Sequence, residues 1–276
     1  MRGVVQVAAG LLLSLTAVYA FQMPFRTLIS QEGYNNEPLP PDYRDHNEFV
    51  IGRLMYPGGF GGRFRGGGGW EMGGTAWSND YPRGDRAFAR ILRRLTRVDV
   101  RSVEQPINLN DGDDVYNWPW LYAAHIESAS MPDSMVLKLR EYLARGGFFY
   151  VDDFWGDAGW ERVMELMGRI IPNAQAEEIG DDDAIFHVLY DLKDRFMVAN
   201  HNELMRTGQP YHNIPGGREA HWRAIRDAKG RIVIVLNFNS DIGDSWEWAD
   251  RPEYPEKYSN LGMRISINYT AYAMTH

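Results

Sequence analysis

The chain has 276 residues, 44% of them hydrophobic, which is enough material for one large or two small packed domains. Its 37 acidic and 29 basic side chains give a net charge of -8, which argues against the cationic surface that nucleic acid or an anionic membrane requires. The absence of cysteine excludes disulfides, thiolate nucleophiles and sulfur-ligated metal centres.

Residues 1–20 have the pattern of a bacterial export signal. Arg2 supplies the charged start, an apolar run covers residues 4–18, and the tripeptide Val18-Tyr19-Ala20 matches the small-x-small rule for cleavage. About 15 apolar residues fall short of the roughly 20 that span a bilayer, so cleavage is favoured over retention as an anchor. The sequence therefore predicts a periplasmic or secreted protein that begins at Phe21 and has no membrane span after cleavage.

Two irregular segments are expected before the regular part of the domain. Residues 21–48 are polar and contain several prolines, which predicts an extended lead-in over the domain. Residues 58–74 contain ten glycines. This glycine-rich insertion matches neither of the phosphate-binding motifs GxxxxGK[ST] and GxGxxG, so a surface insertion is favoured over a nucleotide-binding loop.

From residue 49 onward, short apolar runs alternate with helical stripes. Strands are predicted at 49–56, 98–103, 120–126 and 148–151, with helices at 88–95, 132–143 and from about 158 to 171. Residues 221–238 predict an antiparallel hairpin, and a closing helix follows from 259 to about 274. The pattern predicts a single α/β domain over 49–276, with an open, mainly parallel sheet, helices on both faces and the hairpin at one side.

Two acidic strings follow predicted strands. Asp152 and Asp153 come directly after the strand at 148–151, and Asp241 and Asp244 come after the second strand of the hairpin. Ligands of doubly wound sheets bind at the carboxyl ends of the strands. We therefore expect these four carboxylates to converge on one cleft.

Tryptophans accompany both strings, and Trp155, Trp246 and Trp248 are expected to wall this cleft. Carboxylates interleaved with indole rings suit sugar recognition and also suit a divalent cation, although no cofactor motif is evident and the spacing does not match a calcium loop. The alternative is an ordinary loop whose tryptophans close the core.

Asp152 and Asp153 also have a structural interpretation. One would cap the helix that begins near Ala158, and the other would pair with an arginine such as Arg86 or Arg90.

The histidines offer a weaker signal. His187, His201, His212 and His221 lie in the least regular region, where three could converge on a metal, but no HExxH motif pairs two of them. No GxSxG elbow is present either, which disfavours a serine hydrolase of the α/β type.

Five strings carry a resemblance to a known family. They are RLMYP at 53–57, NDYP at 79–82, VDDFWG at 151–156, DIGDSWEWAD at 241–250 and INY at 267–269. The chain resembles, from about Phe49 to His276, a bacterial family filed as domain of unknown function 4159. The resemblance implies a doubly wound, flavodoxin-like fold similar to class I glutamine amidotransferases, and it implies no established activity.

Amidotransferase catalysis needs a cysteine on the turn after a strand. If the folds align, Asp152-Asp153-Phe154 occupies that turn here, so the thiol route is excluded. Two hypotheses remain. The first is a recognition or assembly domain without catalysis that holds a glycan, peptide or protein partner of the envelope. The alternative is a hydrolase of a glycosidic, amide or ester bond, with Asp152 or Asp153 as general acid/base or metal ligand.

Overall fold

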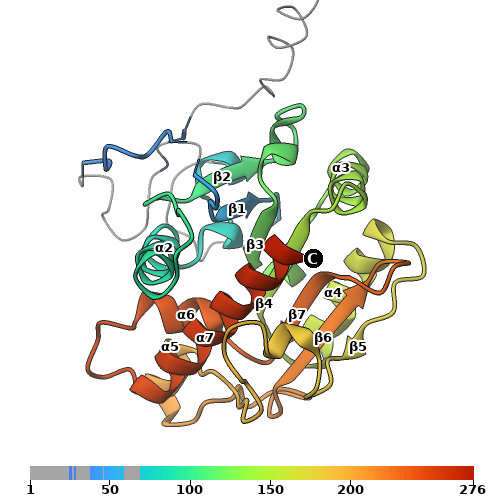
Figure 1. The fold of residues 1–276 in the computed structure, drawn as a ribbon. Coiled ribbons are helices and arrows are strands. Elements are labelled where there is room, and N and C mark those ends of the chain that lie inside the picture. Colours follow the sequence, from blue (N-terminus) through green and yellow to red (C-terminus); the bar gives the residue numbers. More distant parts are fainter. Residues whose placement is uncertain (1–24, 27, 29–37, 46, 59–68) are drawn as a thin grey trace, which may run out of the picture.

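The computed structural model describes residues 25–26, 28, 38–45, 47–58 and 69–276 (Figure 1). The predicted export signal and most of the glycine-rich insertion lie outside these residues. In the described part of the lead-in, Asp42 accepts hydrogen bonds from Ser102 and pairs with Arg93, so this piece contacts the domain. No helix among the described residues combines the length and the apolar character that crossing a membrane requires.

The described elements alternate between strands and helices. The strands are β1 (Gly52–Met55), β2 (Gln105–Asn108), β3 (Trp120–Ala124), β4 (Phe148–Phe154), β5 (Glu177–Glu178), β6 (His221–Arg226) and β7 (Ile232–Phe238). The α-helices are α2 (Arg83–Leu95), α3 (Asp133–Ala144), α4 (Gly156–Ile170), α5 (His201–Thr207), α6 (Ile242–Glu247) and α7 (Glu256–Thr275). Short 3₁₀ helices are η2 (Trp70–Met72), η3 (Ala76–Ser78), η4 (Asp114–Asn117), η5 (Ile126–Ser128) and η6 (Ala184–Phe186).

The strands form one seven-stranded sheet in the order β2-β1-β3-β4-β7-β6-β5. The five strands from β2 to β7 run parallel, and β6 and β5 continue the sheet in antiparallel pairing. The prediction of an α/β fold with a mainly parallel sheet and a hairpin at one side is therefore confirmed.

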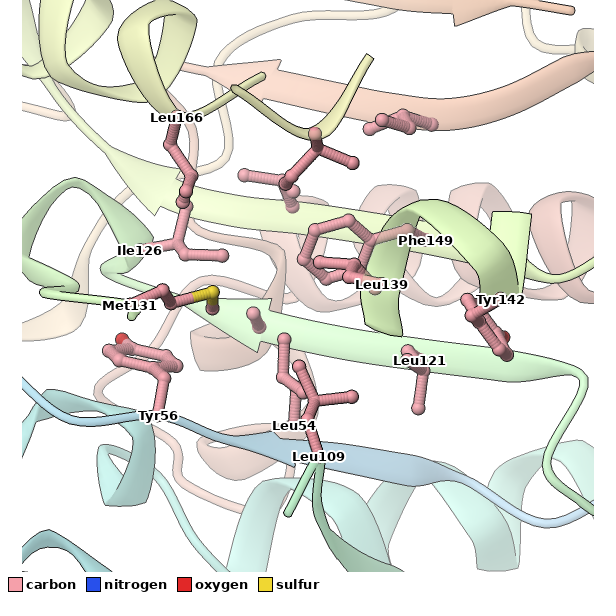
Figure 2. Close-up of a cluster of buried hydrophobic side chains, with 14 of the residues drawn as sticks. Leu54, Tyr56, Leu109, Leu121, Ile126, Met131, Leu139, Tyr142, Phe149 and Leu166 are labelled. Carbon is pink, nitrogen blue, oxygen red and sulfur yellow. The ribbon is translucent and has the colours of Figure 1, made fainter. Parts of the chain in front are cut away.

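Helices cover both faces of the sheet because each central strand is apolar on both sides. Leu121 and Phe149 face α3 and α4, as Figure 2 shows for Leu121, Phe149 and Leu139. The alternate residues Trp120 and Tyr150 face the opposite layer, which contains α2, α6 and α7. In Figure 1, α7 crosses in front of the sheet on this second face.

The boundaries differ from the prediction in several places. The strand predicted at 98–103 is not formed, and β2 lies at Gln105–Asn108 instead. Within 98–103 only Val100 forms an isolated bridge, because the chain turns where the Arg101 guanidinium bonds the carbonyl oxygen of Val103. The sequence also missed β5, α5 and α6, which are too short to display a hydrophobic period.

Candidate metal centre

The acidic strings meet at the carboxyl edge of the sheet. β4 and β7 are parallel neighbours, so the residues that follow them emerge side by side. Two groups of three carboxylates form there, and in each group one oxygen per residue lies within 4.8 Å of the others. The first group contains Asp80, Asp153 and Asp241, and the second contains Asp80, Asp244 and Glu247. We call these five residues the acid cluster.

Asp153 lies near the end of β4, where the pairing with β7 is irregular, and it has a left-handed conformation with φ of 51°. Aspartate and asparagine tolerate this region better than most residues with a side chain. Its Oδ1 accepts a hydrogen bond from Trp155 Nε1 at 2.6 Å, and its Oδ2 lies 2.7 Å from His125 Nε2. His125 follows β3, whose last residue pairs in register with Asp152. Strand pairing therefore delivers the imidazole to Asp153.

Asp241 and Asp244 belong to the start of α6. Asp241 is its N-cap, and its Oδ1 accepts the backbone N–H of Asp244 at 2.8 Å. Asn200 donates to the other oxygen of Asp241 at 2.8 Å. Asp244 accepts hydrogen bonds from the backbone of His201 at 2.5 Å and from Trp248 Nε1 at 2.9 Å. These donors orient both carboxylates and leave lone pairs for a further ligand.

Asp80 comes from the loop between η3 and α2 and also has a positive φ, of 60°. Its Oδ1 accepts a hydrogen bond from Asn79 Nδ2 at 2.8 Å. Its Oδ2 is buried and accepts no hydrogen bond from an N–H or hydroxyl donor among the described residues, while the Glu247 carboxyl group lies beside Asp80. A Cβ placed on Gly243 would lie 3.0 Å from this oxygen and 3.4 Å from Asp241 Oδ1, so both oxygens face one small space beside the bare glycine.

Asp152 has a different role from its neighbour. Its Oδ2 accepts hydrogen bonds from Tyr122 Oη at 3.0 Å and from the backbone N–H groups of Ile242 and Gly243 at 2.8 and 2.9 Å. It belongs to neither group of three carboxylates. Asp152 therefore ties the first turn of α6 to the end of β4 and holds the cluster in shape.

Burial and mutual repulsion perturb the acids. Burial, followed by the charge of Asp153, raises the pKa of Asp152 to about 8 and that of Asp80 to about 6. Burial, followed by the charge of Asp153, also raises the pKa of Asp241 well above the usual range, and burial, followed by the charge of Asp80, does so for the pKa of Asp244. Burial acts in the same direction on Asp153, but the charge and hydrogen bond of His125 outweigh it and lower its pKa. Without a cation, the cluster would therefore take up protons.

The nearby arginines are already paired with other acids. Arg53 pairs with Asp85 at 2.7 Å, and Arg86 bonds Glu104 at 3.1 Å. The structural interpretation therefore named the wrong partners for Asp152 and Asp153. Arg86 serves another carboxylate and Arg90 lines a surface cavity, while α4 begins after Trp155 without a side-chain cap. The partner of Asp153 is an imidazole.

The three tryptophans separate into two kinds. Trp155 and Trp248 each donate their indole N–H to an acid of the cluster. Trp246 is fully buried and stacks on Phe88 with the ring centroids 4.6 Å apart, so it belongs to the core. The cluster approaches solvent at His125, whose side chain is 25% exposed, and at Glu247, which lines a surface cavity of about 460 Å³.

The four histidines considered from the sequence have separate surroundings. His187 pairs with Asp191, His201 stacks on Trp248, His221 stacks on Phe238, and the ring of His212 is tilted against Trp155. No histidine belongs to either three-carboxylate group found within the described ranges.

Sequence reasoning missed Asp80 and His125 as site residues. His125 could have been found with a shorter strand prediction, because it directly follows β3, which ends at Ala124 and not at residue 126. Asp80 carried no comparable signal, since it follows a 3₁₀ turn and reaches the site only through the fold. Asp250, which belongs to the second acidic string, instead has a side chain that is 77% exposed and pairs with Arg83.

All five members of the acid cluster offer carboxylate oxygen atoms as metal ligands. Oxygen ligands suit hard cations such as Ca²⁺, Mg²⁺ and Mn²⁺. The five carboxylates therefore fit a divalent cation. The buried Oδ2 of Asp80 accepts no hydrogen bond from an N–H or hydroxyl donor among the described residues, so it is available as a ligand atom.

Comparison with known proteins adds the family. No curated protein sequence matches the chain significantly. A family model described as "Domain of unknown function (DUF4159)" matches residues 69–274, which include the whole acid cluster. The chain therefore belongs to the DUF4159 family.

Proposed function

We propose that this domain binds a divalent cation in the acid cluster and uses it to hold a polar ligand, as a recognition domain without catalysis. The observation that carries the proposal is the buried Oδ2 of Asp80, which has no hydrogen-bond donor and faces Asp241 across the space beside Gly243. A buried carboxylate oxygen without a partner carries a free-energy cost that a cation removes.

The spacing of the acids favours a cation over a glycosidase pair. Oxygens of Asp80, Asp153 and Asp241 lie within 4.8 Å of one another. The two carboxyl groups of retaining glycosidases lie about 5–5.5 Å apart, and those of inverting enzymes about 6.5–9.5 Å apart, with the substrate between them. Here three acids, rather than two, each direct one oxygen to a common point, as ligands of one ion would.

The proposal also covers the type of fold and the cellular location. The parallel strands follow the order β2-β1-β3-β4-β7, which is the order of flavodoxin-like sheets and supports an amidotransferase-like scaffold. The chain contains no cysteine for amide transfer. The apolar start of the sequence supports export to the bacterial periplasm, where the ligand would be a glycan, peptide or protein of the envelope.

A metal-assisted hydrolase is the second candidate, and His125 favours it. Its imidazole contacts Asp153 and is 25% exposed, so it could reach a substrate bound beside the cation. In that case the cation would activate water, and His125 would hold or move a proton at its Nε2 atom.

Thermal unfolding of the purified protein tests cation binding. After dialysis against chelator, we expect Ca²⁺, Mg²⁺ or Mn²⁺ at a hundredfold excess over its Kd to raise Tm by about 5–10 °C. Sodium chloride of equal ionic strength should not reproduce this rise.

Asp80→Asn should abolish the rise, and it should still fold because asparagine also tolerates a positive φ. The matched control is Asp113→Asn, which removes one charge from an exposed acid paired with Lys138 and should keep the full rise. An unchanged Tm in the wild type would refute cation binding, and equal rises in both variants would place the bound cation outside the acid cluster. Cleavage of model esters or glycosides that requires His125 would replace the recognition proposal by the hydrolase.

A further inference from the structure

The acid cluster contains two groups of possible cation ligands, and the inference drawn from them rests on the proposed cation binding. Its two groups of three carboxylates share a single member, Asp80. Asp153 and Asp241 complete one group, and Asp244 and Glu247 complete the other. Each group by itself supplies three oxygen ligands, with water or a bound ligand available to complete a coordination shell.

Helix geometry explains why there are two groups. Asp241, Asp244 and Glu247 are spaced three residues apart along α6 and its N-cap, so they lie on one face of the helix. Three residues correspond to a rise of about 4.5 Å in an α-helix. Two-metal sites place their ions about 3.5–4 Å apart. Successive acids of this face are therefore spaced suitably for neighbouring ions.

The shared position of Asp80 is independently marked as a ligand position. Its Oδ2 is one of the buried carboxylate oxygens that lack an N–H or hydroxyl donor among the described residues, and it faces Asp241 Oδ1 beside Gly243. A carboxylate has two oxygens with several lone pairs, so it can contact two ions at once. Asp80 is therefore the residue that the two groups of carboxylates share.

The balance of charge also favours two ions. The five carboxylates of the cluster carry a formal charge of -5 when ionised. One divalent cation would leave most of this charge buried, whereas two would leave a residual -1 beside the His125 imidazole.

We propose that the acid cluster binds two divalent cations, bridged by Asp80, with Asp153 and Asp241 on one ion and Asp244 and Glu247 on the other.

Equilibrium dialysis with Mn²⁺ tests this proposal on the purified protein. We expect two Mn²⁺ per wild-type chain and an exchange-coupled electron paramagnetic resonance spectrum in place of the six-line signal of isolated ions. Asp153→Asn and Glu247→Gln should each reduce the stoichiometry to one and restore the six-line signal. Asp80→Asn should weaken Mn²⁺ binding at least tenfold at both positions, and Asp113→Asn should still bind two.

The outcomes separate the two proposals. One Mn²⁺ per wild-type chain, or two ions with an uncoupled spectrum, would overturn the bridged pair and leave single-cation binding intact. No bound Mn²⁺ would overturn both. The wild-type stoichiometry and spectrum decide the question even where a variant fails to fold, which near-ultraviolet circular dichroism would reveal.

Discussion

Two buried charged regions lie close together, and they differ in how their buried charges are compensated. In the first, Arg53 forms a two-point ion pair with Asp85, and both side chains are fully buried. In the second, five carboxylates gather around one buried space and His125 is the basic group in contact with them. The two regions are adjacent, because Arg53 also donates hydrogen bonds to the carbonyl oxygens of Trp77 and Asn79, next to Asp80.

The difference separates a structural charge from a functional one. The guanidinium of Arg53 matches the geometry of a carboxylate, so this pair is satisfied within the protein. The acid cluster is not satisfied in the same way, since burial and mutual repulsion raise the pKa values of most of its members. A cluster of acids with perturbed pKa values is therefore a candidate binding site.

The largest loss of stability is expected from breaking the ion pair between Arg53 and Asp85. Arg53→Met leaves the Asp85 carboxylate buried without its partner and removes the bonds to the loop before Asp80. We expect a loss of about 3–5 kcal/mol in the free energy of unfolding, measured by urea denaturation. Arg94→Met on the exposed side of α2 is the control and should cost little. A loss below about 1 kcal/mol for Arg53→Met would show that the pair is not structural.

The acid cluster and the neighbouring Asp152 should make the free energy of unfolding depend on pH. The folded pKa values of Asp80 and Asp152 are about 6 and about 8, whereas their usual value is 3.8. Between pH 4 and pH 8 the folded state therefore holds more protons than the unfolded state, and stability falls as pH rises. We expect a fall of at least about 2 kcal/mol in the cation-free protein, measured by urea denaturation across this range.

Saturating Mg²⁺ or Ca²⁺ should reduce this dependence, because a cation replaces the protons. A cation-free protein whose stability rises from pH 4 to pH 8 would contradict the crowding of these acids.

Filling the space beside the acids should disturb binding more than folding. A Cβ at Gly243 would lie 2.6 Å from Tyr122 Oη and 3.0 Å from Asp80 Oδ2. We expect Gly243→Ala to cost about 1–3 kcal/mol by overpacking and to weaken Mn²⁺ binding at least tenfold, measured by equilibrium dialysis. Gly168→Ala in α4 is a matched control, since nothing lies within 4 Å of its Cβ position. Unchanged Mn²⁺ affinity in Gly243→Ala would place the ion elsewhere.

The smallest effect is expected at the hairpin edge, where charges are balanced and exposed. Glu177 on β5 pairs with Arg226 on β6. Glu177→Gln should change the free energy of unfolding by less than about 1 kcal/mol, because water screens exposed ion pairs. A loss comparable to that of Arg53→Met would mean that exposure does not separate the two kinds of pair.

The sequence by itself determined the layers of the fold and the edge where the site lies. Apolar residues on both sides of β3 and β4 require helices on both faces, which α2, α3, α4 and α7 provide. The rule that ligands bind beyond the carboxyl ends of strands correctly directed attention to Asp153, Asp241 and Asp244 as neighbours.

Only the tertiary structure decided which acids do what. Asp152 and Asp153 are adjacent and chemically identical, yet successive strand residues point in opposite directions, and a positive φ turns Asp153 out of the strand. Asp152 therefore binds the first turn of α6, while Asp153 joins the cluster. His125 arrives through sheet order, which a strand prediction can anticipate. Asp80 arrives from a distant loop, and no local pattern encodes its position because loop packing is a property of the folded chain.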